Sequence, residues 1–282
     1  MTNETKTIRL LTIGNSFADN ATRYLGEIAA AAGDELLYTG ANLPGGPLSV
    51  HWEGVVAHEK KCENGCLYND RSLTDLLSSE PWDVVTLQQF SGESHAEGSY
   101  RPYAEKLHAL IQKLSPSATI LLHQTWAYRA DDTEQITHEY SQENMHTDIR
   151  NAYHTIADEL NVGIIPVGDA FAAARNHPEW NFVPDAKFDP KTAEYPNRPQ
   201  DRHSLCAGFT WKEWLELPEM HLDTHHASEA GQYLAAAVFF EMLFGKSSYG
   251  NTFRPAEVPA EEVLFLQEIA HETVCSAQRL HP

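Results

Sequence analysis

Five short apolar segments, separated by stretches of helical periodicity, constrain the fold of this 282-residue chain more than any other feature. The segments are residues 8–13, 36–41, 84–87, 119–122 and 163–167. The helical patterns between them lie at about residues 20–32, 72–78, 100–114 and 143–160. Strands that are apolar throughout are typically buried on both faces, and their alternation with helices is typical of βαβ units. We therefore expect an α/β fold, a three-layer α/β/α sandwich around a central parallel sheet of about five strands.

The rest of the chain fits one enlarged domain. A chain of this length with 42% hydrophobic residues can bury a single large core. Residues 182–222 break the alternation and are rich in Pro, Asp, Lys and aromatic residues, so we interpret them as an irregular, lid-like insertion. Amphipathic patterns predict a helix at 228–244 and an added C-terminal helix at about 257–279, packed outside the sheet. We predict a single domain over residues 1–282.

The charge balance argues against two classes of partner. Twenty basic residues against forty acidic ones give a formal net charge of −20, which disfavours nucleic acid and anionic membrane surfaces. The chain has no run of 18 apolar residues, and its first residues lead into the first strand without a signal-peptide core. We expect a cytoplasmic protein that acts on a small molecule and needs no cofactor.

Ser16 follows the first apolar segment directly, in Gly14-Asn15-Ser16-Phe17. A strand followed by a helix brings this hydroxyl to free backbone N–H groups, which stabilise an oxyanion. Far downstream, Asp223 and His226 stand three residues apart and offer the base and the orienting carboxylate that a serine nucleophile needs. In an α/β fold both places can lie at the carboxyl edge of the sheet. The residues predict a serine hydrolase, although Gly-Asn-Ser alone also fits an ordinary capping turn.

A histidine cluster around the predicted base leaves a metal alternative open. Imidazole and carboxylate are ordinary zinc ligands, so the cluster could instead serve a metal-dependent hydrolase. Its members are His221, Asp223, His225 and His226, to which His203 can be added. This alternative leaves the Gly-Asn-Ser turn unexplained. We therefore expect no metal, and we take His226 rather than His225 as the base, because the spacing of three residues brings it to Asp223.

The cysteines do not form a disulfide framework. Four cysteines are too few for one in a chain of this length. His58, Cys62 and Cys66 could be drawn as three metal ligands on one helical face, but this cysteine spacing is not that of a usual zinc site. A local disulfide or two free thiols at Cys62 and Cys66 is the simpler interpretation.

Two sequence blocks resemble those of the SGNH hydrolase superfamily, also called GDSL-like esterases and lipases. Gly14-Asn15-Ser16-Phe17 is similar to its first block, where Gly-Asp-Ser is commoner, and residues 223–234 are similar to its last block. Residues 82–91 further resemble one branch of that superfamily. The similarity covers nearly the whole chain, and residues 182–222 match least. The resemblance implies a flavodoxin-like strand order, with Ser16 as nucleophile, His226 as base and Asp223 as orienting acid.

The same resemblance implies an oxyanion hole with three donors: the serine N–H, a glycine N–H after the second strand and an asparagine amide after the third. Among the glycines that follow the second strand we choose Gly46. The asparagine is absent, and Gln88 is our first choice for its place, with Gln89 second. Loss of one such donor typically costs about 100- to 1,000-fold in turnover. The missing asparagine therefore leaves open an alternative, in which the chain is a non-catalytic carbohydrate-binding or scaffold protein that retains the fold.

Aromatic residues near the predicted strand ends are candidate substrate contacts. Trp126 follows the fourth strand, and His51 and Trp52 follow the glycine turn. Such rings can stack on a sugar, and they can equally pack in the core. Together with Ser16, these residues predict hydrolysis of a small acyl ester, such as an acetyl ester, on a carbohydrate or similar polar carrier.

Overall fold

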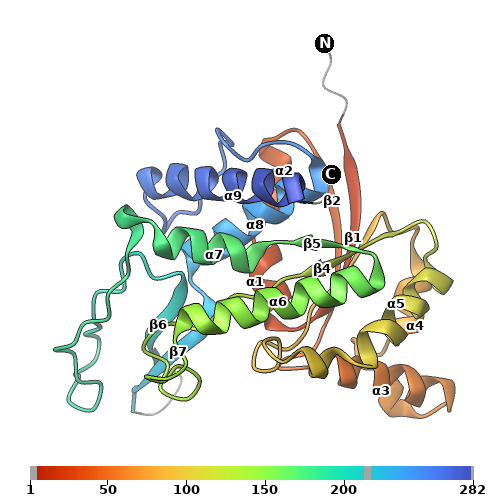
Figure 1. The fold of residues 1–282 in the computed structure, drawn as a ribbon, viewed down its shortest axis with the longest axis horizontal. Coiled ribbons are helices and arrows are strands. Elements are labelled where there is room, and N and C mark those ends of the chain that lie inside the picture. Colours follow the sequence, from red (N-terminus) through yellow and green to blue (C-terminus); the bar gives the residue numbers. More distant parts are fainter. Residues whose placement is uncertain (1–4, 213–216, 281–282) are drawn as a thin grey trace.

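Five parallel strands form the centre of this computed structural model, which describes residues 5–212 and 217–280 (Figure 1). They are β1 (Thr7–Gly14), β2 (Glu35–Asn42), β3 (Val84–Leu87), β4 (Thr119–His123) and β5 (Gly163–Ile165). Their order in the sheet is β2-β1-β3-β4-β5, and every neighbouring pair is parallel. The predicted three-layer α/β fold, its five strands and its flavodoxin-like order are confirmed.

The helices form two groups that flank the sheet. In the first group α8 contacts α1, α2 and α7, and α9 packs on the outside of α8 and α7. In the second group neighbouring helices contact one another from α3 through α6. The first group comprises α1 (Ser16–Thr22), α2 (Leu25–Ala31), α7 (Val167–Asn176), α8 (Glu229–Phe244) and α9 (Ala260–Leu280). The second comprises α3 (Leu48–Glu59), α4 (Leu73–Ser79), α5 (Tyr103–Leu114) and α6 (Gln142–Leu160).

Local signals explain where several helices begin and end. Ser72, Ser141 and Ser228 accept hydrogen bonds from backbone N–H groups at the starts of α4, α6 and α8. Helix α8 ends at Gly245, whose φ of 66° is the left-handed conformation that glycine adopts readily. Nearly all of α8 is buried, because it contacts α1, α2 and α7 and is covered by α9.

Three features differ from the sequence-based expectation. The helix expected at 20–32 is divided at Arg23 and Tyr24 into α1 and α2, and α3 and α7 were not expected. The stretch expected to be irregular, 182–222, contains β6 (Cys206–Lys212) and the start of β7 (Glu219–Ala227). These two strands form a separate antiparallel sheet. Residues 213–216 of that stretch lie outside the described residues.

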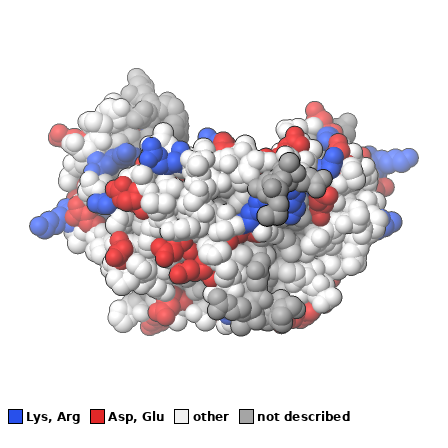
Figure 2. Space-filling model, turned by 90° about the horizontal axis from the view of Figure 1, so that it is seen from above, with Lys and Arg blue, Asp and Glu red and all other residues white. Residues whose placement is uncertain are grey.

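The surface carries both signs of charge. Over the face seen in Figure 2, acidic and basic side chains are interspersed. Among the described residues, no helix is both long enough and apolar enough to cross a membrane.

Candidate active site

Ser16 occupies the first position of α1, immediately beyond the carboxyl end of β1. Asn15 has extended backbone and caps the helix, since its Oδ1 accepts a hydrogen bond from Phe17 N at 3.0 Å. Asn15 and Phe17 are buried, whereas Ser16 is partly exposed. Gly14 fits this turn because a Cβ there would stand only 2.5 Å from Gln88 Oε1. The turn thus presents the serine hydroxyl at the edge of the sheet while burying its neighbours.

A continuous chain of hydrogen bonds joins Ser16 to His226 and Asp223. His226 Nε2 lies 2.8 Å from Ser16 Oγ, and His226 Nδ1 lies 2.8 Å from Asp223 Oδ2. Because an ionised carboxylate only accepts hydrogen bonds, Nδ1 carries the imidazole proton and donates a hydrogen bond to Asp223. The lone pair on Nε2 then faces the serine hydroxyl. This arrangement can move a proton from Ser16 to His226.

The Asp223 carboxylate is held in its ionised form. Burial alone would raise the pKa of Asp223, but hydrogen bonds from the His226 side chain and backbone, with the nearby imidazoles, hold that pKa well below its usual range. Its Oδ1 accepts from the backbone N–H groups of His225 and His226, at 3.2 and 2.9 Å. A fixed anion beside His226 orients the neutral imidazole and stabilises an imidazolium.

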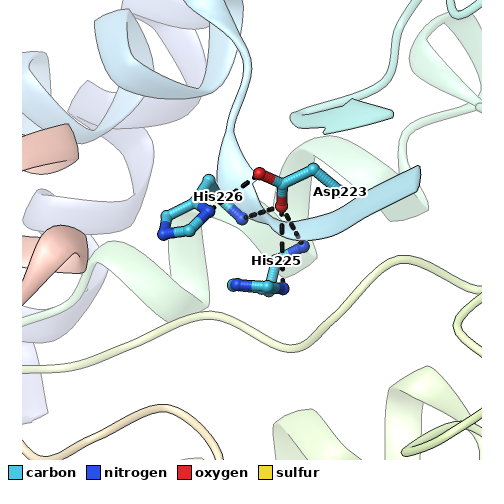
Figure 3. Close-up of side chains that lie close together, drawn as sticks. All are labelled: Asp223, His225 and His226. Atoms are coloured by element: carbon cyan, nitrogen blue, oxygen red, sulfur yellow. Dashed lines mark hydrogen bonds and ion pairs between the residues drawn. The ribbon is translucent and has the colours of Figure 1, made fainter. Parts of the chain in front are cut away.

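The His225 imidazole approaches the other oxygen of the same carboxylate and lies next to the His226 ring. Figure 3 shows Asp223 with His225 and His226 near its two oxygens. His225 Nδ1 is 3.6 Å from Asp223 Oδ1, and its ring centre is 4.3 Å from that of His226. Burial lowers the pKa of His225 against the opposing charge of Asp223, which favours its neutral form at neutral pH.

The histidine cluster is only partly assembled. Ligand atoms of Asp223, His225 and His226 lie within 4.8 Å of one another, and no other group of three such residues does so in residues 5–212 and 217–280. His203 instead stacks on Trp180. Because the group of Asp223, His225 and His226 is the one found among the described residues, the ligand atoms of His58, Cys62 and Cys66 do not converge there. Both cysteines are free and exposed.

Three hydrogen bonds to the backbone of β7 hold this strand beside Ser16. Ala227 N donates to Asn20 Oδ1 at 2.8 Å, which links the end of β7 to α1. Trp126 Nε1 donates to the carbonyl of His225 at 2.8 Å. A third bond, from the backbone N–H of Arg129 to the Thr224 carbonyl at 2.8 Å, anchors the middle of the strand. None of these partners carries a sequence signal, because each contact joins residues nearly 100 or more positions apart.

The two glutamines at the end of β3 brace the backbone around Ser16. Gln88 Oε1 accepts from Asn15 N at 3.0 Å, and its Nε2 donates to the carbonyl of Gln89. Gln89 Oε1 accepts from Leu48 N at 3.0 Å, and its Nε2 donates to the carbonyl of Ser99 at 2.9 Å. Both side chains are buried. Their amide donors are therefore engaged away from the serine hydroxyl.

Of the two backbone N–H groups expected in the oxyanion hole, that of Gly46 is engaged elsewhere and that of Ser16 is not. Gly46 N donates to the Leu43 carbonyl at 2.8 Å, while the Gly46 carbonyl accepts from Asn15 Nδ2 at 3.2 Å. Among the hydrogen bonds of the described residues, none uses the N–H of Ser16. Of the four expected donors, the structure leaves the Ser16 N–H available.

Of the two tryptophans expected to contact substrate, Trp126 packs inside the protein, whereas Trp52 is partly buried against the core. Trp126 is fully buried, with its ring stacked between Phe17 and Phe171 at centroid distances of 4.2 and 4.5 Å. Lys106 Nζ on α5 lies 5.3 Å from the centre of the Trp52 ring. In this structure Trp126 supports the site from behind and offers no exposed face to a sugar.

His51 is likewise enclosed, but it touches the nucleophile turn. Its Nε2 lies 3.0 Å from the Gly14 carbonyl, and its Nδ1 lies 2.6 Å from Tyr68 Oη. Burial lowers the pKa of His51 to about 4, so the ring is neutral at pH 7. A carbonyl can only accept, so Nε2 donates to Gly14 and Nδ1 accepts from the tyrosine. His51 thus steadies the residue two positions before Ser16.

Known proteins resemble this chain in sequence and in fold. The family model described as a domain of unknown function, DUF4886, matches residues 9–185. The structure of a DUF4886 family protein from Bacteroides uniformis has 23% identity and a TM-score of 0.72, and the similarity covers 96% of this chain and 95% of that one. A proposed SGNH hydrolase from Slackia heliotrinireducens has 20% identity and a TM-score of 0.52, over 84% of this chain and 98% of that one. No curated protein matches the chain.

Proposed function

The chain belongs to the DUF4886 family, whose model matches more than half of it, and from this premise we propose that the protein is a serine ester hydrolase of the SGNH type. The hydrogen-bonded series Ser16, His226 and Asp223 carries the proposal. The fold shared with a proposed SGNH hydrolase supports it.

The proposed reaction proceeds through an acyl-enzyme. Ser16 Oγ attacks the ester carbonyl carbon while His226 Nε2 takes the serine proton. Asp223 stabilises the imidazolium that forms. The carbon–oxygen bond to the alcohol then breaks, and the leaving oxygen takes the proton from His226. Water, activated by the same imidazole, next attacks the acyl group on Ser16 and releases the acid.

The oxyanion that forms during attack is held first by the Ser16 N–H, which no described residue uses. Gly46 can add its N–H only after it releases the Leu43 carbonyl. We assign the amides of Gln88 and Gln89 a supporting role, since they hold the backbone of Asn15 and Leu48. A hole with few ready donors fits an activated or small ester better than a demanding amide.

The proposed substrate is a short acyl ester, such as acetyl, on a carbohydrate or similar polar carrier. The surroundings of His226 are polar and aromatic: His225 lies 5.3 Å from the ring of Tyr128, whose hydroxyl bonds to Ser91 at 2.9 Å. A panel of acetylated sugars against esters of longer acids tests this choice. We expect kcat/KM to be highest for acetyl esters, and a preference for long acyl chains would contradict it.

Replacement of the nucleophile tests the reaction itself. Ser16→Ala should lower hydrolysis of nitrophenyl acetate by at least about 10⁴-fold, because removing a member of such a triad has costs of this order. A fluorophosphonate probe should label the unaltered protein at Ser16. Ser117→Ala, at an exposed turn, is the matched control and should behave as the unaltered protein. Full activity of Ser16→Ala would end the proposal.

The engaged donors favour one alternative, a carbohydrate-binding protein that retains the fold without catalysis. That protein would bind an acetylated sugar and leave it intact, and the fluorophosphonate would not label Ser16. Labelling together with turnover would exclude this alternative.

A further inference from the structure

We propose that Asp223, His225 and His226 also form a binding site for a divalent transition-metal ion such as Zn²⁺, and that the bound ion blocks the serine chemistry. The blocking effect rests on the proposed function. The metal site itself does not, because it depends only on the positions of three ligands.

The ligands are of the right kind and already converge. Zinc takes imidazole nitrogen and carboxylate oxygen at about 2.0–2.2 Å. The ligand atoms of Asp223, His225 and His226 lie within 4.8 Å of one another, so small side-chain movements bring all three to one ion. Figure 3 shows the carboxylate beside the two neighbouring imidazoles, with dashed contacts to both residues. The ion would replace the hydrogen bond between Asp223 and His226, and we therefore expect weaker binding than at a structural zinc site.

His225 distinguishes this cluster from a simple serine–histidine–aspartate series. The proposed hydrolysis uses only His226 and Asp223. Among the hydrogen bonds of the described residues, none involves the imidazole of His225, whose nearest charged contact is Asp223 Oδ1 at 3.6 Å. The side chain is 39% exposed, so an ion can reach it from solvent. His225 thus supplies a ligand that catalysis does not need.

Metal binding and proton transfer exclude each other at His226. An ion on Nδ1 requires the tautomer in which the imidazole proton has moved to Nε2, which then donates to Ser16 and cannot accept its proton. An ion on Nε2 occupies the lone pair that faces Ser16 directly. In either geometry His226 is lost as a base. No oxidation or reduction is involved and no proton is released, since the ion binds a lone pair of the neutral imidazole and displaces a hydrogen bond.

The ligand set also selects among metals. Two imidazoles and one carboxylate suit Zn²⁺, Cu²⁺ and Ni²⁺. Calcium takes six to eight oxygen ligands, and magnesium prefers carboxylates and water in an octahedral arrangement. One carboxylate from the protein does not meet either need. We expect zinc to bind and magnesium to have no effect.

Binding is measured first, without any reliance on activity. The background protein carries Ser16→Ala, together with Cys62→Ser and Cys66→Ser, which remove two exposed thiols, because thiolate is a common zinc ligand. Competition with a chromophoric zinc indicator should show one equivalent of Zn²⁺. His225→Asn should weaken zinc binding at least about tenfold. Loss of a residue that only supports a metal ligand already costs about this much, and His225 is a proposed ligand itself. His221→Asn, on the same strand but outside the cluster, is the matched control and should leave the affinity unchanged.

Activity is measured next, with nitrophenyl acetate and the serine restored. Zinc should inhibit the unaltered protein and a chelator should restore its activity, whereas zinc should leave the activity of His225→Asn at that variant's own metal-free level. Equal zinc affinity with and without His225, or activation by zinc, would overturn the metal proposal. Zinc binding that depends on His225 in a protein without esterase activity would overturn the proposed function and leave the metal site standing.

Discussion

The two parts of the candidate site are held in different ways. The turn before Ser16 belongs to the central sheet: the Gly14 carbonyl accepts from Leu43 N at 2.9 Å and from His51, and buried Gln88 holds the next residue. The strand that carries His226 belongs instead to a two-stranded sheet outside it, and most of that strand is partly exposed. The comparison teaches that core folding positions Ser16, the proposed nucleophile, whereas a peripheral hairpin positions His226, the proposed base.

One buried cation anchors that hairpin. The Arg129 side chain is 3% exposed and pairs with Asp131 and Asp201 at 2.7 Å each. Its guanidinium also lies 4.6 Å from the ring of Phe182, and its backbone N–H bonds to Thr224 in β7. A single residue thus joins the loop after β4 to the coil before β6 and to β7. Changes at Arg129 should loosen the position of His226 without loosening that of Ser16.

The largest expected effect on activity comes from removing the charge of Asp223 in β7. Asp223→Asn should lower kcat/KM for nitrophenyl acetate by about 10⁴-fold, because an amide in this place favours the wrong imidazole tautomer. Global stability in urea should change little, since the hairpin lies outside the central sheet. His221→Asn on the same strand is the control and should keep full activity. A drop in activity of less than tenfold for Asp223→Asn would remove Asp223 from the reaction.

The next largest effect concerns the anchor. Arg129→Met removes one partner of a buried ion cluster, a change that costs about 3 kcal/mol or more. We expect hydrogen exchange of β7 amides to become about 100-fold faster, while amides of β1 and β3 keep their rates. Arg150→Met, which alters a more exposed pair with Asp169, is the control and should have almost no effect. Equal acceleration in β1 would show that the hairpin and the sheet open together.

A smaller effect is expected on the nucleophile side. His51→Phe removes the donor to Gly14 and leaves the buried Tyr68 hydroxyl unpaired, at a cost of about 1–3 kcal/mol. Because His51 packs in the core, the free energy of unfolding in urea and kcat should both decrease. In the hairpin variants, by contrast, we expect the global stability to change little. His58→Phe, on the same helix but partly exposed, is the control. Loss of activity without loss of stability would contradict this part of the comparison.

The smallest expected effect is on acid stability. The folded-state pKa of Asp223 lies below its unfolded value of about 4, so its contribution to stability is complete above that pH and is lost as pH falls further. Asp223→Asn should therefore flatten the loss of stability below about pH 4, by no more than about 1 kcal/mol because solvent screens a partly exposed group. Urea titrations at pH 7 and pH 3 measure it. If the variant lost more unfolding free energy between pH 7 and pH 3 than the unaltered protein, the predicted contribution of Asp223 would be wrong.

The sequence predicted what depends on apolar patterning and missed what depends on distant pairing. All five strands of the central sheet were found from their apolar segments. Burial on both faces explains this for β1 and β3, whereas the edge strand β2 is apolar in sequence although it is mostly exposed. The hairpin was missed, since β6 and β7 are mostly partly exposed and lack a clear alternation. The predicted approach of Ser16 and His226 appears as a hydrogen bond, and their roles stay a proposal.

Side-chain direction limited the remaining site predictions. The sequence shows that Gln88, Gln89 and Trp126 follow strands, but not which way each side chain turns. In the structure Gln88 faces Asn15, and Trp126 lies between two phenylalanines. Such orientations depend on helices that pack against the strand ends. His225, which the sequence offered as a second candidate base and as an alternative metal ligand, carries the further inference.

The separation of Ser16 and His226 by 210 residues also affects biosynthesis. A ribosome delivers Ser16 to the chain 210 residues before His226. A nascent chain that has emerged only as far as β6 carries the hydroxyl without its partner imidazole. Because α8 follows β7 and packs on α1 and α2, the bond between the two residues can form only after this later part of the chain has been synthesised. Under the proposed function, a product truncated before β7 would lack its proton acceptor.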